Sequence, residues 1–209
     1  MRRNLATPRF LLACLVIVSA AGPAIARKPP AQWPGPVAKG AVKSVVDGDT
    51  LVLNNGTEVR LVGIQSPKLP LERRNFPTRP LAPVSKAVLT KLLLGKDLTL
   101  NYSGRKIDRH GRLLAHLFFK NLNWTQGALL EAGMVRVYSF PDNRSRIAEM
   151  LKHERTASKA KLGIWGHSYY RIINHQQTQR YLRNFQLIEA KVLKAVVVWG
   201  RAYLNFGEN

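Results

Sequence analysis

VVDGDTLVLNNGTEVRLVGIQSPK, at residues 45–68, is the stretch that decides the fold. Within it, two runs of alternating apolar and polar residues, 50–53 and 58–64, lie on either side of an Asn-Asn-Gly sequence. Alternation of this kind is typical of half-buried strands, and an Asn-Gly pair between two such runs is a strong signal for a tight turn. The stretch therefore predicts a β-hairpin.

Two carboxylates lie just before the first of these strands. Asp47 and Asp49 flank Gly48, so a turn at this point would hold their oxygens close together, where they could ligate a hard cation. Arg60 alternates with apolar residues on the second strand, and its guanidinium can therefore reach the same end of the sheet. The alternative is a solvated acid pair with Arg60 salt-bridged to it, since short acidic turns are common on protein surfaces.

Further motifs follow in order along the chain: DRHGRLLAHLF at 108–118, GALLEAGMVRVY at 127–138 and KLGIW at 161–165. Together with VVDGDT and VRLVGIQSP, they resemble the staphylococcal nuclease (thermonuclease) family over about residues 42–165. The resemblance implies an α+β fold, with an OB-fold five-stranded β-barrel and about three helices. It also implies calcium-dependent hydrolysis of nucleic-acid phosphodiesters.

The resemblance assigns roles to several residues of the predicted site. Asp49 matches the family's first calcium-ligating aspartate. Asp47 would not ligate the ion directly but would contact the groups that do. Arg60 and Arg112 match the two arginines that grip the phosphate. These matches predict that the phosphate-binding half of the site is present.

Gln65 and Lys68 depart from the family motif G-I-D-x-P-E, in which the aspartate is a second calcium ligand and the glutamate is the proposed general base. Gln65 offers a neutral carbonyl oxygen instead of a charged one, so calcium is possible but should bind weakly. Lys68 stands at the base position. A protonated lysine cannot accept a proton from water, so it could act as a base only if its surroundings lowered its pKa enough to deprotonate it. We therefore predict that cleavage is impaired or altered.

The charge of the chain indicates a polyanionic partner. Its 209 residues include 33 Lys and Arg against 12 Asp and Glu, which gives a formal net charge of +21. A charge of this size favours binding to nucleic acid or to an anionic envelope surface. With the family resemblance it predicts single-stranded DNA or RNA as the partner, and no residue identifies a contact to a 2′-hydroxyl that would favour RNA.

The first 26 residues have the pattern of a secretory signal peptide. Three arginines precede an apolar run at 10–21, and an A-x-A cleavage sequence ends at Ala26. The run is too short for a stable membrane span. This predicts an exported protein, periplasmic or extracellular, with a Pro-rich leader at 27–40, the thermonuclease-like domain at 41–166 and a C-terminal extension at 167–209.

Apolar periodicity predicts the remaining elements. Strands are expected at 41–46, 98–102 and 113–119, and helices at 83–94, 124–132 and from Asn143 or Ser145 to 162. In the C-terminal extension, residues 186–193 and 195–206 alternate and predict a further β-hairpin.

Three functions are compatible with these patterns. We favour an exported thermonuclease-like protein that binds nucleic-acid phosphates and in which Gln65 and Lys68 impair or alter calcium-dependent cleavage. One alternative is an active metal-dependent nuclease that uses another group as its base. The other is an envelope interaction module that uses the basic surface and the C-terminal hairpin.

Overall fold

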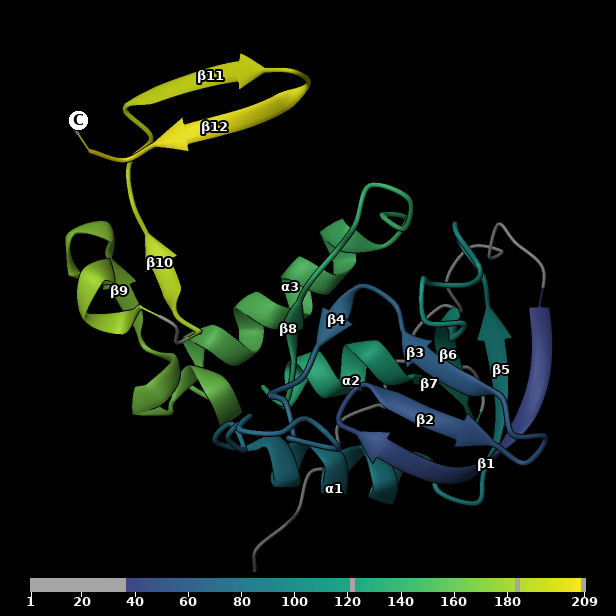
Figure 1. The fold of residues 1–209 in the computed structure, drawn as a ribbon. Coiled ribbons are helices and arrows are strands. Elements are labelled where there is room, and N and C mark those ends of the chain that lie inside the picture. The colour runs from purple at the N-terminus through teal and green to yellow at the C-terminus, as the bar shows by residue number, and fades with distance from the viewer. Residues whose placement is uncertain (1–36, 121–122, 183–184, 208–209) are drawn as a thin grey trace, which may run out of the picture. The chain divides into compact units, whose positions relative to one another are not determined.

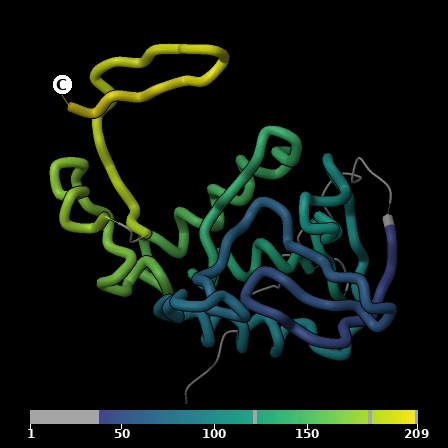
Figure 2. Tube along the Cα trace, viewed as in Figure 1, coloured from purple at the N-terminus to yellow at the C-terminus, as the bar shows by residue number. Residues whose placement is uncertain are grey.

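A computed structural model describes residues 37–120, 123–182 and 185–207 (Figures 1 and 2). All of them belong to one compact unit, Gln32–Asn209. The predicted signal peptide and most of the predicted leader lie outside the described residues. Among the residues that are described, no helix combines the length and the apolar character needed to cross a membrane.

Five strands close into a barrel. They are β1 (Val37–Asp47), β2 (Thr50–Leu53), β3 (Glu58–Leu61), β5 (Asp97–Asn101) and β6 (Leu113–Phe119). Around the barrel they run in the order β3, β2, β1, β5, β6, and a parallel pairing between β3 and β6 closes the circle. All the other neighbours pair antiparallel. The predicted α+β fold with a five-stranded OB-type barrel is therefore confirmed.

Strand β1 is longer than the sequence predicts and serves two neighbours. It begins at Val37, four residues before the predicted start, because residues 37–41 pair with β5. Its second half pairs with β2, and this pairing contains two irregularities in register, between Val42 and Ser44 and between Val45 and Asp47, of the kind that bends a strand. At Gly40 a Cβ atom would lie 2.8 Å from a methyl group of Leu53, so the missing side chain lets the two strands approach closely.

The predicted hairpin is confirmed as β2 and β3, with Thr50 opposite Arg60. The second strand ends at Leu61 rather than at residue 64. Gly63, at φ +79°, turns the chain there. The next two residues form β4 (Ile64–Gln65), which pairs with β8 (Arg136–Val137). After this turn, Gln65 no longer pairs with the barrel strands and lies opposite Arg136 of β8.

Helices α1 (Ala82–Leu93), α2 (Thr125–Glu131) and α3 (Ile147–Lys159) pack around the barrel, α1 against β1, α2 against β6 and α3 against α2 (Figure 1). A short strand, β7 (Asn123–Trp124), leads into α2. The three helices were predicted, but α3 begins later than expected and neither Asn143 nor Ser145 caps it. Asn143 is buried, and its amide donates to the carbonyl oxygen of Arg105 at 3.1 Å. Its side chain therefore fixes a neighbouring loop instead of the helix end.

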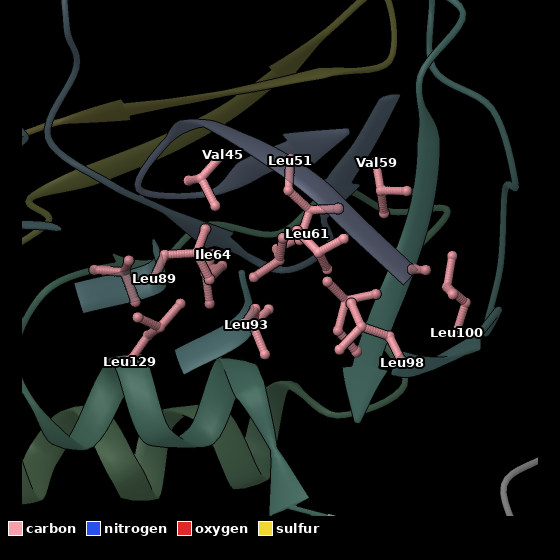
Figure 3. Close-up of a cluster of buried hydrophobic side chains, with 14 of the residues drawn as sticks. Val45, Leu51, Val59, Leu61, Ile64, Leu89, Leu93, Leu98, Leu100 and Leu129 are labelled. Atoms are coloured by element: carbon pink, nitrogen blue, oxygen red, sulfur yellow. The ribbon is translucent and has the colours of Figure 1, made fainter. Parts of the chain in front are cut away.

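The core fills the barrel and the space between the barrel and the helices. Figure 3 shows Leu51 and Leu61 from the barrel strands together with Leu89, Leu93 and Leu129 from α1 and α2. Each such side chain contributes about 1.5–3 kcal/mol when it is fully buried. The core positions follow the alternation and the helical spacing of the sequence, which is why the individual strands and helices could be predicted.

The C-terminal part contains short elements. They are three 3₁₀ helices (Gly163–Trp165, Ser168–Tyr170 and His175–Tyr181) and the strands β9 (Ile172–Asn174), β10 (Leu187–Glu189), β11 (Lys194–Val198) and β12 (Arg201–Asn205). A hairpin is present, but its predicted strands are wrong. β10 pairs in parallel with β9, and β11 pairs with β12. The turn falls at Trp199 and Gly200, both at positive φ as a tight hairpin turn requires, inside the run predicted as one strand.

Candidate functional site

The acidic turn is held in place by close packing around Gly48. It joins the end of β1 to the start of β2. A Cβ atom on Gly48 would lie 2.0 Å from the Oγ of Ser85 and 2.7 Å from the Cβ of Ser66. Ser85 belongs to the first turn of α1, and Ser66 directly follows β4. Only glycine fits, so the turn is clamped between the helix and the loop.

Asp49 is fully buried, and neighbouring donors orient its carboxylate. Its Oδ2 accepts hydrogen bonds from the backbone N–H of Ser66 at 2.7 Å and from the Ser66 hydroxyl at 3.1 Å. Its Oδ1 accepts from the hydroxyl of Thr50 at 3.1 Å. Asp47 accepts the backbone N–H of Asp49 at 3.0 Å, which fixes the turn itself. The two carboxylates are therefore set in one geometry by their immediate neighbours.

Lys68 places its ammonium group between the two acids. The Nζ atom lies 2.8 Å from each carboxylate oxygen of Asp49 and 3.1 Å from Oδ2 of Asp47. The two contacts with Asp49 have the usual length of charge-assisted hydrogen bonds, and the contact with Asp47 is longer. Lys68 thus acts as a bound cation for the two acids around it.

Burial and the charges of this cluster shift the pKa values of the two acids in opposite directions. Burial opposes the ionisation of Asp49, but the positive charges of Arg60 and Lys68 outweigh it and hold the pKa of Asp49 well below its ordinary value. Burial raises the pKa of Asp47, and the charge of Asp49 adds to this against a smaller effect of Lys68. Asp49 is therefore the acid whose charge the cluster stabilises.

Arg60 links the acidic turn to the backbone of the following turn. Its Nη1 donates to the carbonyl oxygen of Leu61 at 2.6 Å and to that of Asp49 at 3.3 Å. Its Nη2 donates to the carbonyl oxygen of Ile64 at 2.6 Å and lies 3.3 Å from Oδ2 of Asp49. Both terminal nitrogens of this guanidinium thus contribute to holding β3, β4 and the acidic turn together.

Gln65 and Arg112 do not join this cluster. The side-chain oxygen of Gln65 accepts a hydrogen bond from Nη2 of Arg136 at 2.7 Å. Arg112 binds one oxygen of Asp108 through Nε at 2.8 Å and Nη2 at 2.7 Å, and its Nη1 lies 4.0 Å from Glu58. The structure therefore brings together Asp47, Asp49, Arg60 and Lys68, and gives the side chains of Gln65 and Arg112 other hydrogen-bond partners.

Comparison with known families gives a match over three of the five barrel strands, β3, β5 and β6, and over helices α1 to α3. The model of the family "Staphylococcal nuclease homologue" matches residues 58–167. The chain belongs to this family. The matched segment contains Arg60, Lys68 and Arg112, whereas the acidic turn lies just before it. The recognised family and its barrel are thus confirmed, while the site roles carried over residue by residue stay predictions.

Three relatives illustrate how far this staphylococcal nuclease homologue resembles characterised and uncharacterised proteins. An uncharacterized protein of Bacillus anthracis is 31% identical over 131 residues, which cover 61% of this chain and 60% of that protein. The thermonuclease of Staphylococcus intermedius is 27% identical over 127 residues, 59% of this chain and 74% of the enzyme. The SPbeta prophage-derived endonuclease YokF of Bacillus subtilis is 32% identical over 130 residues, 60% of this chain and 43% of the endonuclease.

Calcium, which the resemblance implies for the family, does not fit the residues as they are arranged in this homologue. A calcium ion is typically bound by about six to eight oxygen ligands. Here Lys68 contacts both oxygens of Asp49, and the Gln65 oxygen faces Arg136. Within residues 37–120, 123–182 and 185–207, no group of three or more His, Cys, Asp or Glu side chains could hold a metal. Weak calcium binding stays a prediction that requires Lys68 to move.

Three residues of the homologue's site were missed by the sequence analysis. Ser66 and Thr50 orient Asp49. Thr50 directly follows Asp49 in the sequence and was a usable local signal, whereas Ser66 lies 17 residues away from Asp49. Arg136 holds Gln65 from 71 residues further along the chain, through the pairing of β4 with β8. No local pattern indicates that contact, because it depends on which short strands meet.

Proposed function

We propose that this staphylococcal nuclease homologue is an exported protein that binds the phosphates of single-stranded nucleic acid, and that Lys68 impairs its calcium-dependent cleavage. Its membership of the family supports a nuclease-like function and hence a nucleic-acid substrate. The observation that carries the proposal is the ammonium group of Lys68 at 2.8 Å from both oxygens of Asp49.

An ammonium group at this place opposes hydrolysis in two ways. A divalent cation about 4 Å away would be repelled by roughly 8 kcal/mol at an effective dielectric constant of about 20. The protonated amine also offers no lone pair with which to take a proton from the attacking water. Both the cation and the base that metal-assisted hydrolysis uses are therefore disfavoured at once.

Binding of nucleic acid does not need the cation. The net charge of +21 attracts polyanions over long distances. Arg112 is our first candidate for a phosphate contact, because its side chain is 26% exposed and its carboxylate partners lie towards the surface. Arg60 is the second, and it would have to give up part of its hydrogen bonding to the backbone. Export is proposed from the sequence pattern of residues 1–26.

One experiment tests the proposal. The purified chain is incubated with single-stranded DNA and RNA, in calcium or in chelator, and binding is measured over a range of salt concentrations. We expect binding that weakens with salt, with a slope of about −0.7 in log K against log salt for each phosphate neutralised. We expect no cleavage that depends on calcium. Absence of binding at low salt would remove the polyanion proposal.

The second candidate is an active metal-dependent phosphodiester hydrolase. It is favoured by the presence of Asp49, Arg60 and Arg112, and by the 23% exposure of the Lys68 side chain, which leaves it a path out of the cluster. Calcium-dependent cleavage by the unmodified chain in the same assay would select this function over the first.

A further inference from the structure

A cavity of ≈ 260 Å³ has Lys68 in its lining and is built by three separate parts of the chain. The loop after β4 supplies Arg73, Phe76 and Arg79, β8 supplies Arg136, and the C-terminal part supplies Tyr170 and Phe185. The last two lie after residue 167, where the family match ends. The cavity therefore combines the family's barrel with residues beyond the part that defines the family.

The lining of the cavity is basic. None of its lining residues is Asp or Glu, while one Lys and three Arg contribute to it. Lys68 is paired with acids, but Arg73, Arg79 and Arg136 have no carboxylate within 4.0 Å in the part of the chain that the structure describes. Glu154 attracts Arg136 from further away and accepts the backbone N–H of Val137 instead. The positive charge of the three arginines thus remains available to an anion.

Neutral partners hold these guanidinium groups in place. Arg136 donates to the side-chain oxygen of Gln65 at 2.7 Å, and Arg79 donates to the hydroxyl of Tyr169. Arg73 donates through Nε to the carbonyl oxygen of Pro70 at 3.2 Å. Each partner accepts a hydrogen bond without cancelling the charge. An anion entering the cavity would therefore meet cations that are already oriented.

Aromatic rings lie next to the cations. The guanidinium carbon of Arg73 lies 3.6 Å from the ring centre of Phe76, and that of Arg136 lies 4.3 Å from the ring centre of Phe185. Flat pairs of this kind, an arginine against an aromatic ring, are surfaces on which an unstacked nucleobase can lie. The combination of unneutralised arginines and flat rings matches a ligand that carries both a phosphate and a base.

We propose that this cavity binds one nucleotide unit that carries a terminal phosphate. Its volume is just below the lower end of the range for small-ligand pockets, about 300 Å³, so it takes one unit and not a longer stretch of strand. The same chemistry has two sources, a free mononucleotide and the phosphorylated end of a single strand. The inference rests on the proposed function only in taking nucleic acid as the partner.

The test measures binding of AMP, adenosine and inorganic phosphate to the purified chain by calorimetry. We expect AMP to bind at least about tenfold more tightly than either fragment, because the cavity would contact both halves of the nucleotide. A short oligonucleotide with a terminal phosphate, compared with the same strand ending in hydroxyl groups, identifies the source. Tighter binding of the phosphorylated strand assigns strand ends, and equal binding of the two strands assigns the free nucleotide.

Two variants and a matched control locate the site. Arg136→Gln and Phe185→Leu should each weaken AMP binding by about tenfold, the size of one charge-assisted hydrogen bond or one stacked base. Lys91→Gln also removes one positive charge, but from an exposed position on α1 outside the lining, and should change AMP binding by less than about twofold. Phe185→Tyr keeps an aromatic ring and should retain binding, which separates stacking from a general loss of structure.

The outcomes separate this inference from the proposed function. If unphosphorylated strands bind and AMP does not, the cavity inference is wrong and the proposed function stands. If AMP binds in a manner that depends on Arg136 and no strand binds, the proposed function is wrong and the cavity inference stands. If phosphate binds as tightly as AMP, the cavity is a simple anion site and the inference is overturned.

Discussion

The acidic cluster around Asp49 and the arginine-lined cavity share Lys68, yet they treat their charges in opposite ways. In the cluster, Lys68 and Arg60 face buried carboxylates at 2.8–3.3 Å. In the cavity, the arginines are held by an amide oxygen, a hydroxyl group and backbone carbonyls. The first arrangement uses charge to hold the fold together. The second leaves charge available for a ligand.

Lys68 explains how the two regions became different. An acid at this position, as the family resemblance predicts for it, would add negative charge to the cluster and attract a cation. With lysine, the cluster supplies its own cation, and Gln65 is free to bind Arg136 instead of a metal. The ammonium group of Lys68 thus lies within the cluster, while the neighbouring Gln65 holds an arginine of the cavity.

The largest expected effect comes from reversing that change. The double variant Gln65→Asp and Lys68→Glu removes the internal cation and restores a second acidic ligand and a carboxylate base. Calcium-dependent cleavage of single-stranded DNA should rise by at least about 10²-fold, the typical contribution of a positioned general base. The measurement is the cleavage rate in calcium and in chelator.

The single variants are the controls for this experiment. Each should do much less than the pair, because metal and base act as a unit. A double variant that binds calcium and cleaves nothing would show that the cluster has diverged beyond these two positions.

The next effect compares the stability of the two regions directly. Asp49→Asn keeps the shape of the side chain but leaves Arg60 and Lys68 beside a buried amide, and should lower the free energy of unfolding by about 3–5 kcal/mol. Arg136→Gln in the cavity removes a charge that no carboxylate within 4.0 Å compensates in the described residues, and should cost less than about 1 kcal/mol. Urea unfolding measures both. Equal losses would mean that the cavity arginines are as structural as the cluster.

The barrel was expected from the family resemblance, whereas its individual strands and helices were predicted from the sequence because their determinants are local. Alternation in β2 and β3, the Asn-Gly turn between them and helical spacing in α1 all lie within a few residues of one another. The acidic turn and Lys68 were also recognised as parts of one site. The hydrogen-bond partners of the charged side chains were not predicted, because Lys68 contacts Asp49 across 19 residues of sequence and Arg136 contacts Gln65 across 71. The cavity was missed for the same reason, since its walls come from three separate segments.

A smaller effect concerns the dependence of nucleic-acid binding on salt. Arg79→Gln should reduce the slope of log K against log salt for a phosphorylated single strand by about 0.7, because it removes one cation that is available to a phosphate. Lys68→Gln should leave the slope nearly unchanged, because its charge is already balanced by Asp49 and Asp47. Titrations at four salt concentrations give the two slopes. If both variants reduced the slope equally, the charge of Lys68 would be as available to a phosphate as that of Arg79, and the proposed difference between the cluster and the cavity would be wrong.

The smallest expected effect is on the pH dependence of stability in the acidic cluster. The folded-state pKa of Asp49 is lowered, so its contribution to stability is complete above the ordinary value of 3.8 and is lost as the pH falls through the folded-state value. The folded-state pKa of Asp47 is raised, so protonation of this residue favours the folded state as the pH falls, and it partly offsets the loss from Asp49.

Asp47→Asn separates these two opposing contributions. The amide oxygen can still accept the backbone N–H of Asp49, but the residue no longer takes up a proton. The free energy of unfolding of the variant should therefore fall more steeply between pH 6 and pH 3.5 than that of the unmodified chain, by less than about 1.4 kcal/mol per pH unit, the limit for one proton. Urea unfolding at several pH values in this range gives the two slopes. A shallower slope in the variant would contradict the assignment of the raised pKa to Asp47, and with it the picture of a cluster that stabilises the charge of one acid at the expense of its neighbour.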